Sequence, residues 1–552
     1  MHALKRSLFA LPAALLLLVP AVSRAQWVTA RSTDNIVCDA AWNQNRPATV
    51  SDGAGGFVSV WVDQRSGARD DLYAQAFDAN GFARWTTNGV LVDATVGTPF
   101  DVKACSDDSG GVIVSWVRSG GPTSDRIYSQ RIDANGQRRW GAGGMRVSTA
   151  EMVQSLPRIS TDEHGGAIVV WANWLGSTVA NVCGQRLDRD GNRLWSASGD
   201  SLVARGEVRS LTVTRRPGGG VFIGYWYTFG PLGMVAVDNA RTRVMSDTIT
   251  TAAAFYSPPS LYSATAGNGA YLMMAGGFNM NIRWFGANGD RWPASQRVVA
   301  AVYAQEGVKL VGGGPDGSAL LAWRDNRPTG GGIFAQKIRP DGTHQWGAGG
   351  RFITADITWN GGGHAIEADD QNGAWIVWSQ NVDRVAQHVS SSGDFWLPPA
   401  GSVFSDANSS NFTYDAATIV PGLQSTAIVV WSTTQSAGTL NDMHAKRIFG
   451  DGSLTPVGVE DDLAPGSGLA LAAGPSPART NVTLRFALTR AGHATLELFG
   501  LRGERVATLA DGAFAAGTHA RTMDTSALAP GVYLARLTTS EGVANAKVVR
   551  VR

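Results

Sequence analysis

A tryptophan that ends an apolar run recurs along most of this chain at a nearly fixed interval. Four copies follow one another at 55-residue steps, and three more come after a longer gap: Trp61, Trp116, Trp171, Trp226, Trp323, Trp378 and Trp431. A second tryptophan keeps the same phase behind them: Trp85, Trp140, Trp195, Trp292, Trp346 and Trp396. Two markers with one period indicate an internal repeat, and this constrains the fold more than any other feature of the sequence.

Each repeat divides into four short apolar runs separated by turns rich in Asp and Gly. The second run, as in 167–171, is apolar at every position and is typical of a strand buried on both faces. The third run, as in 127–132, alternates apolar and polar residues. Turns such as 52–56 combine an Asp side chain with glycines that accept positive φ, which closes a hairpin at low cost. The unit is therefore predicted to be a four-stranded antiparallel sheet.

Counting second strands gives eight units, beginning near residues 57, 112, 167, 221, 270, 319, 374 and 427. We predict an all-β fold in which residues 26–452 form an eight-bladed β-propeller. The last unit lacks a fourth-strand tryptophan, whereas a spare Trp27 with Ile36 and Val37 precedes the first unit. The N-terminal strand is therefore predicted to close the last blade. An open solenoid and two smaller propellers are the alternatives. The repeats resemble β-propeller repeats of uncharacterised exported bacterial proteins.

The N-terminus has the layout of a secretory signal peptide over residues 1–25. Lys5 and Arg6 precede an apolar stretch, and small residues lie before the expected cut at Ala25. The alternative is a retained anchor, but two prolines interrupt a run that is short for a membrane span. We expect no transmembrane segment in the mature chain. Three cysteines, an odd number, allow one disulfide at most: Cys38, Cys105 and Cys183.

After a linker at 453–470, residues 471–552 form a separate module of about seven alternating strands, which predicts a small β-sandwich. Its segments 474–477, 482–488, 493–499 and 528–537 resemble the C-terminal sorting domain of type IX secretion substrates and FlgD-like immunoglobulin-like domains. Ser476 stands where that family usually has Asn, and Phe499-Gly500 where it usually has Tyr-Asp. The resemblance implies an immunoglobulin-like fold, the type IX secretion machinery as partner, and export through the periplasm to the outer cell surface or the medium.

The sequence contains no convincing catalytic constellation. The eight histidines are scattered and none has the spacing of a zinc hydrolase, and no nucleophile-elbow motif is present. A calcium loop at 188–191 would have too few oxygen ligands, so we predict no metal and no cofactor. The net charge of +2 comes without a basic run, which argues against a nucleic-acid partner.

Polar and aromatic residues gather in the loops that follow the second strands. Because these loops share one face of the ring, they are candidates for a ligand-binding rim: Asp63, Arg65, Arg118, Trp174, Tyr227, Asp325 and Arg327. Local pairing within each Asp-x-Arg loop is the competing interpretation. We predict a non-catalytic binding or adhesion protein for an unknown extracellular carbohydrate, peptide or surface protein. The alternatives are a sialidase-like glycosidase, with channel arginines opposite carboxylates, and a structural envelope component.

Overall fold

The computed structural model describes residues 27–454, 470–474 and 481–550, apart from short stretches within them. These stretches are 96, 121–123, 177–178, 228–231, 250–259, 277–278, 294–295, 299–304, 315, 328–330, 356–362, 381–382, 407–409, 413–416, 424, 435–440, 489, 501–502, 530 and 541. The predicted signal peptide and most of the predicted linker therefore lie outside the described residues. Every regular element within them is a β-strand. They contain no helix with the length and apolar character needed to cross a membrane.

The repeat region folds into eight antiparallel sheets that follow one another along the chain. In the first four sheets the strands pair in chain order: β2 (Gln44–Ser51), β3 (Phe57–Asp63), β4 (Asp71–Phe77) and β5 (Val90–Asp93); β6 (Pro99–Ser106), β7 (Val112–Arg118), β8 (Arg126–Ile132) and β9 (Met145–Arg146); β10 (Gln154–Thr161), β11 (Ala167–Trp174), β12 (Ala180–Leu187) and β13 (Asp200–Gly206); β14 (Val208–Arg215), β15 (Val221–Tyr227), β16 (Leu232–Val237) and β17 (Arg243–Thr248).

The next three sheets repeat this order, and the last one differs from it. The three are β18 (Ser260–Ala266), β19 (Gly269–Gly276), β20 (Asn279–Gly286) and β21 (Gln296–Arg297); β22 (Gln305–Gly313), β23 (Ser318–Asp325), β24 (Gly332–Ile338) and β25 (Arg351–Thr354); β26 (His364–Ala368), β27 (Ala374–Gln380), β28 (Asp383–Val389) and β29 (Ser402–Ser405). The last sheet combines β30 (Ser410–Phe412), β31 (Thr418–Pro421), β32 (Ala427–Thr434) and β33 (Asn441–Ile448) with β1 (Asn35–Cys38).

The second strand of each sheet is mostly apolar and largely buried because the sheet packs against a neighbour on both faces. In β15, Val221 and Ile223 pack toward the preceding sheet, and Phe222 between them packs toward the following sheet. Burying both faces of a strand in this way removes the alternation that a half-exposed strand would show. Six more apolar clusters join the other pairs of consecutive sheets.

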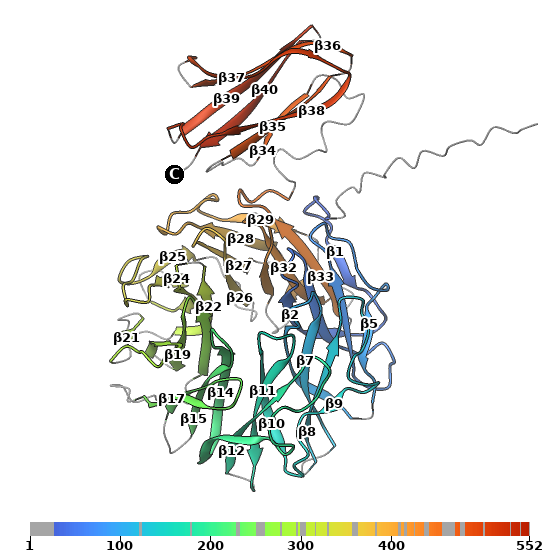
Figure 1. The fold of residues 1–552 in the computed structure, drawn as a ribbon, viewed down its shortest axis with the longest axis vertical. Helices are drawn as coiled ribbons and strands as arrows, with labels where there is room; N and C mark the ends of the chain where they lie inside the picture. Colours follow the sequence, from blue (N-terminus) through green and yellow to red (C-terminus); the bar gives the residue numbers. More distant parts are fainter. Residues whose placement is uncertain are drawn as a thin grey trace, which may run out of the picture.

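The array closes on itself in a propeller-like ring. The first strands contact one another in the order β2, β6, β10, β14, β18, β22, β26 and β31, and β31 contacts β2. Figure 1 shows several of these strands around the centre of the array, with β5, β9, β12, β17 and β25 farther out. One apolar cluster contains Phe57 of the first sheet together with Val37 and Ile428 of the last sheet. The chain thus brings its two most distant repeats together.

The N-terminal segment completes the last sheet, as the spare tryptophan predicted. Strand β1 pairs antiparallel with β33, and Ile36 lies opposite His444. The Trp27 indole N–H donates to the Ala79 carbonyl at 2.9 Å. Trp85 makes the same contact with the Ala134 carbonyl one sheet further on, at 3.1 Å. Trp27 therefore occupies the position of the fourth-strand tryptophan that the last repeat lacks.

The C-terminal module consists of two antiparallel sheets around one core. One sheet has the order β34 (Ala470–Gly474), β35 (Asn481–Leu488) and β38 (Gly517–Asp524). The other has the order β37 (Arg505–Phe514), β36 (Gly492–Gly500), β39 (Gly531–Thr539) and β40 (Gly542–Arg550). Leu484 and Phe486 of the first sheet share an apolar cluster with Leu496 and Leu537 of the second. The module is therefore a β-sandwich.

Candidate functional site

The predicted pair Asp63 and Arg65 is held at the end of β3. The fully buried Asp63 carboxylate accepts the Trp61 indole N–H at 2.7 Å. Both of its oxygens also accept from the Arg65 guanidinium, Oδ1 from Nε at 2.8 Å and Oδ2 from a terminal nitrogen at 2.6 Å. The guanidinium lies 3.6 Å from the centre of the Tyr73 ring. These contacts fix both residues as one packed unit.

Asp325 and Arg327 repeat this arrangement in the sixth sheet. Asp325 accepts from the Trp323 indole at 3.3 Å and from Arg327 at 2.7 Å, and Arg327 lies over the Phe334 ring. Burial alone would raise the pKa of Asp325, but the hydrogen bonds from Arg327 and Trp323 lower it below its usual value. The carboxylate is thus ionised and paired.

Arg118 reaches an equivalent place in the second sheet by a different route. Its guanidinium lies 3.6 Å from the centre of the Tyr128 ring. It donates to Asp93 of the preceding sheet at 2.7 Å and to the Gly143 carbonyl at 2.7 Å. The carboxylate therefore comes from the neighbouring sheet, so this arginine ties two sheets together.

The two aromatic candidates pack inside the array. The Trp174 indole donates to the Ser155 hydroxyl at 2.8 Å and packs against the cluster between the third and fourth sheets. Tyr227 is 3% exposed, its ring lies 5.4 Å from that of Tyr225, and burial raises the pKa of its hydroxyl. The structure thus places the seven predicted residues in five different sheets, where contacts within the protein engage them and do not bring them together at one site.

A second polar arrangement recurs at the opposite ends of the sheets. In the turn between first and second strands, an aspartate caps the turn with one oxygen and binds a cation with the other. Asp107 accepts the N–H groups of Ser109 and Gly111 and faces Arg131 at 2.8 Å. Asp162 faces Arg186 in the same way, and Asp369 faces His388 at 2.7 Å.

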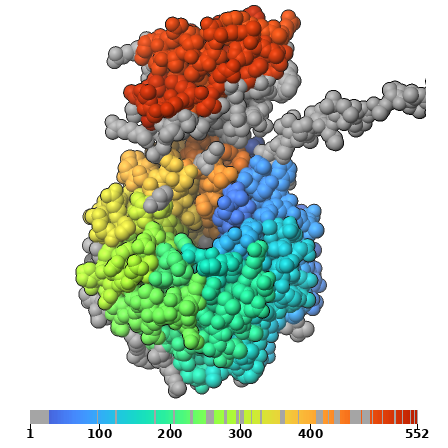
Figure 2. Space-filling model, in the orientation of Figure 1, coloured from blue at the N-terminus to red at the C-terminus, as the bar shows by residue number. Residues whose placement is uncertain are grey.

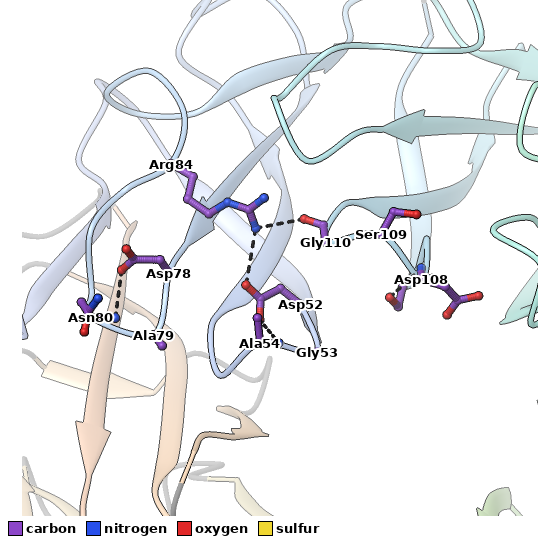
Figure 3. A pocket seen from close by; sticks show the side chains of 11 residues that line it. Asp52, Gly53, Ala54, Asp78, Ala79, Asn80, Arg84, Asp108, Ser109 and Gly110 are labelled. Carbon is purple, nitrogen blue, oxygen red and sulfur yellow. Dashed lines mark hydrogen bonds and ion pairs between the residues drawn. The ribbon is translucent and has the colours of Figure 1, made fainter.

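A hollow of about 770 Å³ lies on this turn face, between the first and second sheets (Figure 3). Three turns and one arginine form its wall: Asp52, Gly53, Ala54, Asp78, Ala79, Asn80, Arg84, Ser106, Asp108, Ser109 and Gly110. Arg84 is anchored by Asp52 at 3.4 Å and by the carbonyls of Gly110 and Ala134 at 3.0 and 2.9 Å. Figure 3 shows Arg84 bridging the turns that carry Asp52 and Gly110.

Several polar groups in this wall have bonding capacity to spare. Asp78 caps its turn through Oδ1, which accepts from Asn80 and Phe82 at 2.9 Å. Among the described residues, Asp78 Oδ2, the Asn80 side-chain amide and the Ser109 hydroxyl make no hydrogen bond. Three aspartates against one arginine make the wall net negative. It can therefore accept hydrogen bonds from a neutral or cationic ligand, and it disfavours an anion.

A smaller hollow of about 280 Å³ repeats this position between the second and third sheets. It includes Asp133, Asn135 and Arg139. Asp133 and Asn135 lie at the positions of Asp78 and Asn80 in the preceding repeat. The sequence pattern at these turns predicts only a capped hairpin. The signal for a further role is the polar residue two positions after each capping aspartate, because the cap itself does not need that side chain.

No group of three His, Cys, Asp or Glu side chains suited to a metal ion occurs among the described residues. The three cysteines are present there as free thiols. Burial raises the pKa of Cys183 to about 12, so this thiol is protonated at neutral pH.

Residues 474–551, which include nearly all of the two-sheet C-terminal module, match the family of secretion system C-terminal sorting domains. The C-terminal module is a sorting domain. Such a domain addresses its protein to the type IX secretion machinery, so this chain is exported to the cell surface or the extracellular space. The sorting domain thus sets the destination of the propeller-like array.

No protein of curated function matches the sequence. Solved structures resemble the chain at low identity. A lectin from Burkholderia pseudomallei is 12% identical, with 64% of this chain and 98% of the lectin aligned at a TM-score of 0.43. An ulvan lyase bound to its saccharide is 11% identical, over 76% of this chain and 96% of the lyase, at a TM-score of 0.40. The β-propeller domain of the trilobed protease from Pyrococcus furiosus is 10% identical, over 65% and 98%, at 0.36. We draw no functional argument from these scores.

Proposed function

We propose that this protein is an exported, non-catalytic binding protein. Its array is an eight-bladed β-propeller that holds an extracellular carbohydrate, and its sorting domain is an immunoglobulin-like sandwich that directs export or surface attachment. Eight sheets joined by eight apolar clusters support the blade count. The two sheets of the sandwich, with three and four strands, support the immunoglobulin-like assignment.

The observation that carries the binding function is the hollow on the turn face. Its volume of about 770 Å³ lies within the range of small-ligand sites. Its walls are backbone turns that the capping aspartates and Arg84 hold in place, so the site is formed before a ligand arrives. The unused groups of Asp78, Asn80 and Ser109 include both donors and acceptors, which suits the hydroxyls of a neutral or amino-substituted sugar.

A saccharide-binding assay tests this proposal. We expect the secreted protein to bind neutral or amino sugars on a glycan array, and isothermal titration to give the affinity for the best of them. Asp78→Asn keeps an oxygen for the turn cap and replaces the free acceptor. It is expected to weaken binding about tenfold, the size of one charge-assisted hydrogen bond.

Asp188→Asn is the matched control, because Asp188 caps an equivalent turn in the third sheet and lies outside both hollows. It should leave the affinity unchanged. Equal losses in the two variants, or failure of every sugar to bind, would refute the turn-face site. Binding of a peptide in place of sugars would keep a binding protein and change its ligand.

The non-catalytic part of the proposal has its own test. Incubation with the bound saccharide, followed by chromatography, should recover it uncleaved. Cleavage abolished by one carboxylate substitution would make the protein a glycosidase, whereas ordered self-assembly without any ligand would favour a structural envelope component.

A further inference from the structure

The first strands of four sheets share a bulge that places a distinct tier of side chains along the channel. Residues 46, 101 and 156, spaced by 55, have φ of 54°, 48° and 54°, and Gly307 has the same left-handed conformation in the sixth sheet. In each case the strand register shifts at this point. Three of the four residues are not glycine, so the conformation costs energy that other contacts must offset.

Beyond each bulge, the strand register puts equivalent residues at one level. Ala48, Lys103, Arg158 and Lys309 each pair with the residue that precedes a first-series tryptophan. Because the first strands form the innermost layer of the ring, this level surrounds the central channel. Three of its members are cations, and Figure 2 shows an opening near the middle of the array. In the order of the ring, the sixth sheet, with Lys309, lies across from the second, with Lys103.

Among the residues that the structure describes, the carboxylates near this level do not balance its positive charge. Asp101 alone serves two of the cations, at 2.7 Å from Lys103 and 3.5 Å from Arg158. The side chains of Lys103 and Arg158 remain 39% and 25% exposed. Lys309 makes no hydrogen bond or ion pair with any described residue, and burial lowers the pKa of its amine.

The other described acids nearby lie beside arginines or are kept partly neutral by burial. Glu207 pairs with Arg209, and Glu306 lies opposite Arg324 in the strand register. Burial raises the pKa of Glu367 on β26 to about 7, so this carboxyl carries at most part of a charge at neutral pH. Arg46 adds an exposed guanidinium at the bulge position that Asp101 occupies one sheet later.

Lys309 is partly desolvated and has no partner among the described residues, which is costly unless a ligand neutralises the cation. We propose that the central channel binds an oxyanionic ligand, carrying carboxylate or sulfate groups, through Lys309 on one side and Lys103 and Arg158 on the other. Cations on opposite walls favour a ligand with several anionic groups over a single small ion. This site is separate from the turn-face hollow, whose net charge is negative.

Titration calorimetry of the secreted protein at low ionic strength tests the channel site. Tetragalacturonate is the probe, sodium sulfate tests a free small anion, and a neutral dextran fragment is the negative control. We expect tetragalacturonate to bind with an affinity that falls steeply with added salt. Full displacement by millimolar sulfate would identify a small oxyanion as the ligand of the same site, whereas weak displacement would identify an acidic saccharide.

Variants locate the binding. Lys309→Met keeps the aliphatic stem and removes the charge, so it should weaken tetragalacturonate binding about tenfold without lowering the melting temperature. Arg46→Asn also removes a cation and suits the left-handed backbone, so it should fold and bind more weakly. Arg139→Gln, in the second turn-face hollow, is the charge-matched control. Absence of binding to every anion, or losses in Arg139→Gln equal to those in both channel variants, would overturn the proposal.

Discussion

Single side chains behind the turn caps hold neighbouring sheets together. The position that follows a buried glutamine in the third strand is Arg131, Arg186, Lys337 or His388. Each pairs with the turn aspartate of its own sheet and also contacts a backbone carbonyl of the next sheet. His388 also bonds the Gly450 carbonyl at 2.9 Å, in the next sheet. The two ring nitrogens of His388 therefore contact the turn aspartate of its own sheet and the next sheet at once. One position thus uses three residue types for the same bridging role.

Asp107→Ala tests the strength of this bridge. The variant removes the turn cap and leaves Arg131, whose side chain is 4% exposed, without its carboxylate. Loss of one partner of a buried pair costs about 3–5 kcal/mol, so the free energy of unfolding should fall by about that amount. Denaturant unfolding followed by tryptophan fluorescence measures it.

Asp78→Ala is the control for that experiment, because Asp78 caps the turn after a third strand with the same two backbone hydrogen bonds and pairs with no cation among the described residues. It should cost only about 1 kcal/mol. Equal losses in the two variants would show that the cap, and not the cation bridge, supplies the stability.

Glu367 gives the array a pH dependence of defined sign. Burial raises the pKa of this carboxyl from 4.5 to about 7, while a hydrogen bond from the Ala368 N–H acts in the opposite sense. The folded state therefore binds the proton more tightly than the unfolded chain. The resulting stability is complete below pH 4.5 and is lost as the pH rises through 7.

Glu367→Gln should remove this dependence. We expect the variant to match the wild type at pH 4.5 and to be more stable at pH 8, by about 1–3 kcal/mol. Thermal unfolding at the two pH values checks it. Glu497→Gln, on β36 of the sandwich and paired with Arg505, lies outside the array and serves as the control. A wild type as stable as Glu367→Gln at pH 8 would contradict the shifted pKa.

At the scale of the strand and its turn, a fourth-strand tryptophan seals several of the seams between sheets. The indole of Trp85 lies against Gly136 and that of Trp140 against Gly191, where a β-carbon would come within 2.9 and 2.8 Å of the ring. Trp27 lies against Gly81 in the same way at 2.7 Å. Only glycine leaves room for the ring there, and the positive φ of these residues requires it as well.

Trp27→Ala should therefore loosen the seam that closes the array. Truncating a buried tryptophan costs about 3–5 kcal/mol, and here the loss falls on the segment that carries β1. Hydrogen exchange should become faster in β1 and β33 before it changes elsewhere. Trp85→Ala removes the same contact from an internal seam and should leave exchange in β1 unchanged. Faster exchange in all sheets alike would argue against a local closure at Trp27.

The repeat made these elements predictable, but it did not reveal the functional residues. The period, the buried second strand and the orphan Trp27 follow from local pattern, because each blade places like residues in like environments. Arg65 pairs with a carboxylate in its own loop, whereas Arg118 pairs with one in the neighbouring sheet. The spacing of residues in the sequence does not show which of these partners an arginine will find. The sequence pattern also does not identify Lys103, Arg158 and Lys309 as channel residues. A bulge just before each of them shifts the alternation of side chains between the two faces of the strand.

For the whole molecule, the sorting domain and the propeller-like array are separate folding units. The apolar cluster of the sorting domain lies within residues 471–548 and shares no described member with the clusters of the array. Each unit therefore has its own core, which is the physical condition for independent folding. The array closes through β1 and β33, so its ring does not require the sorting domain either.

Deletion of residues 474–552 should therefore change where the protein goes without changing the stability of the array. We expect the shortened chain to retain the melting temperature of the array, because no seam between sheets is removed, and to accumulate in the periplasm, because the segment that addresses the type IX machinery is gone. Cell fractionation with immunoblotting, together with calorimetry of the periplasmic protein, measures both. Lys309→Met is the control for export, since it alters the channel and leaves the sorting domain intact. A shortened chain that still reached the medium would show that the array carries an address of its own, whereas one that failed to fold would show that the two cores depend on each other.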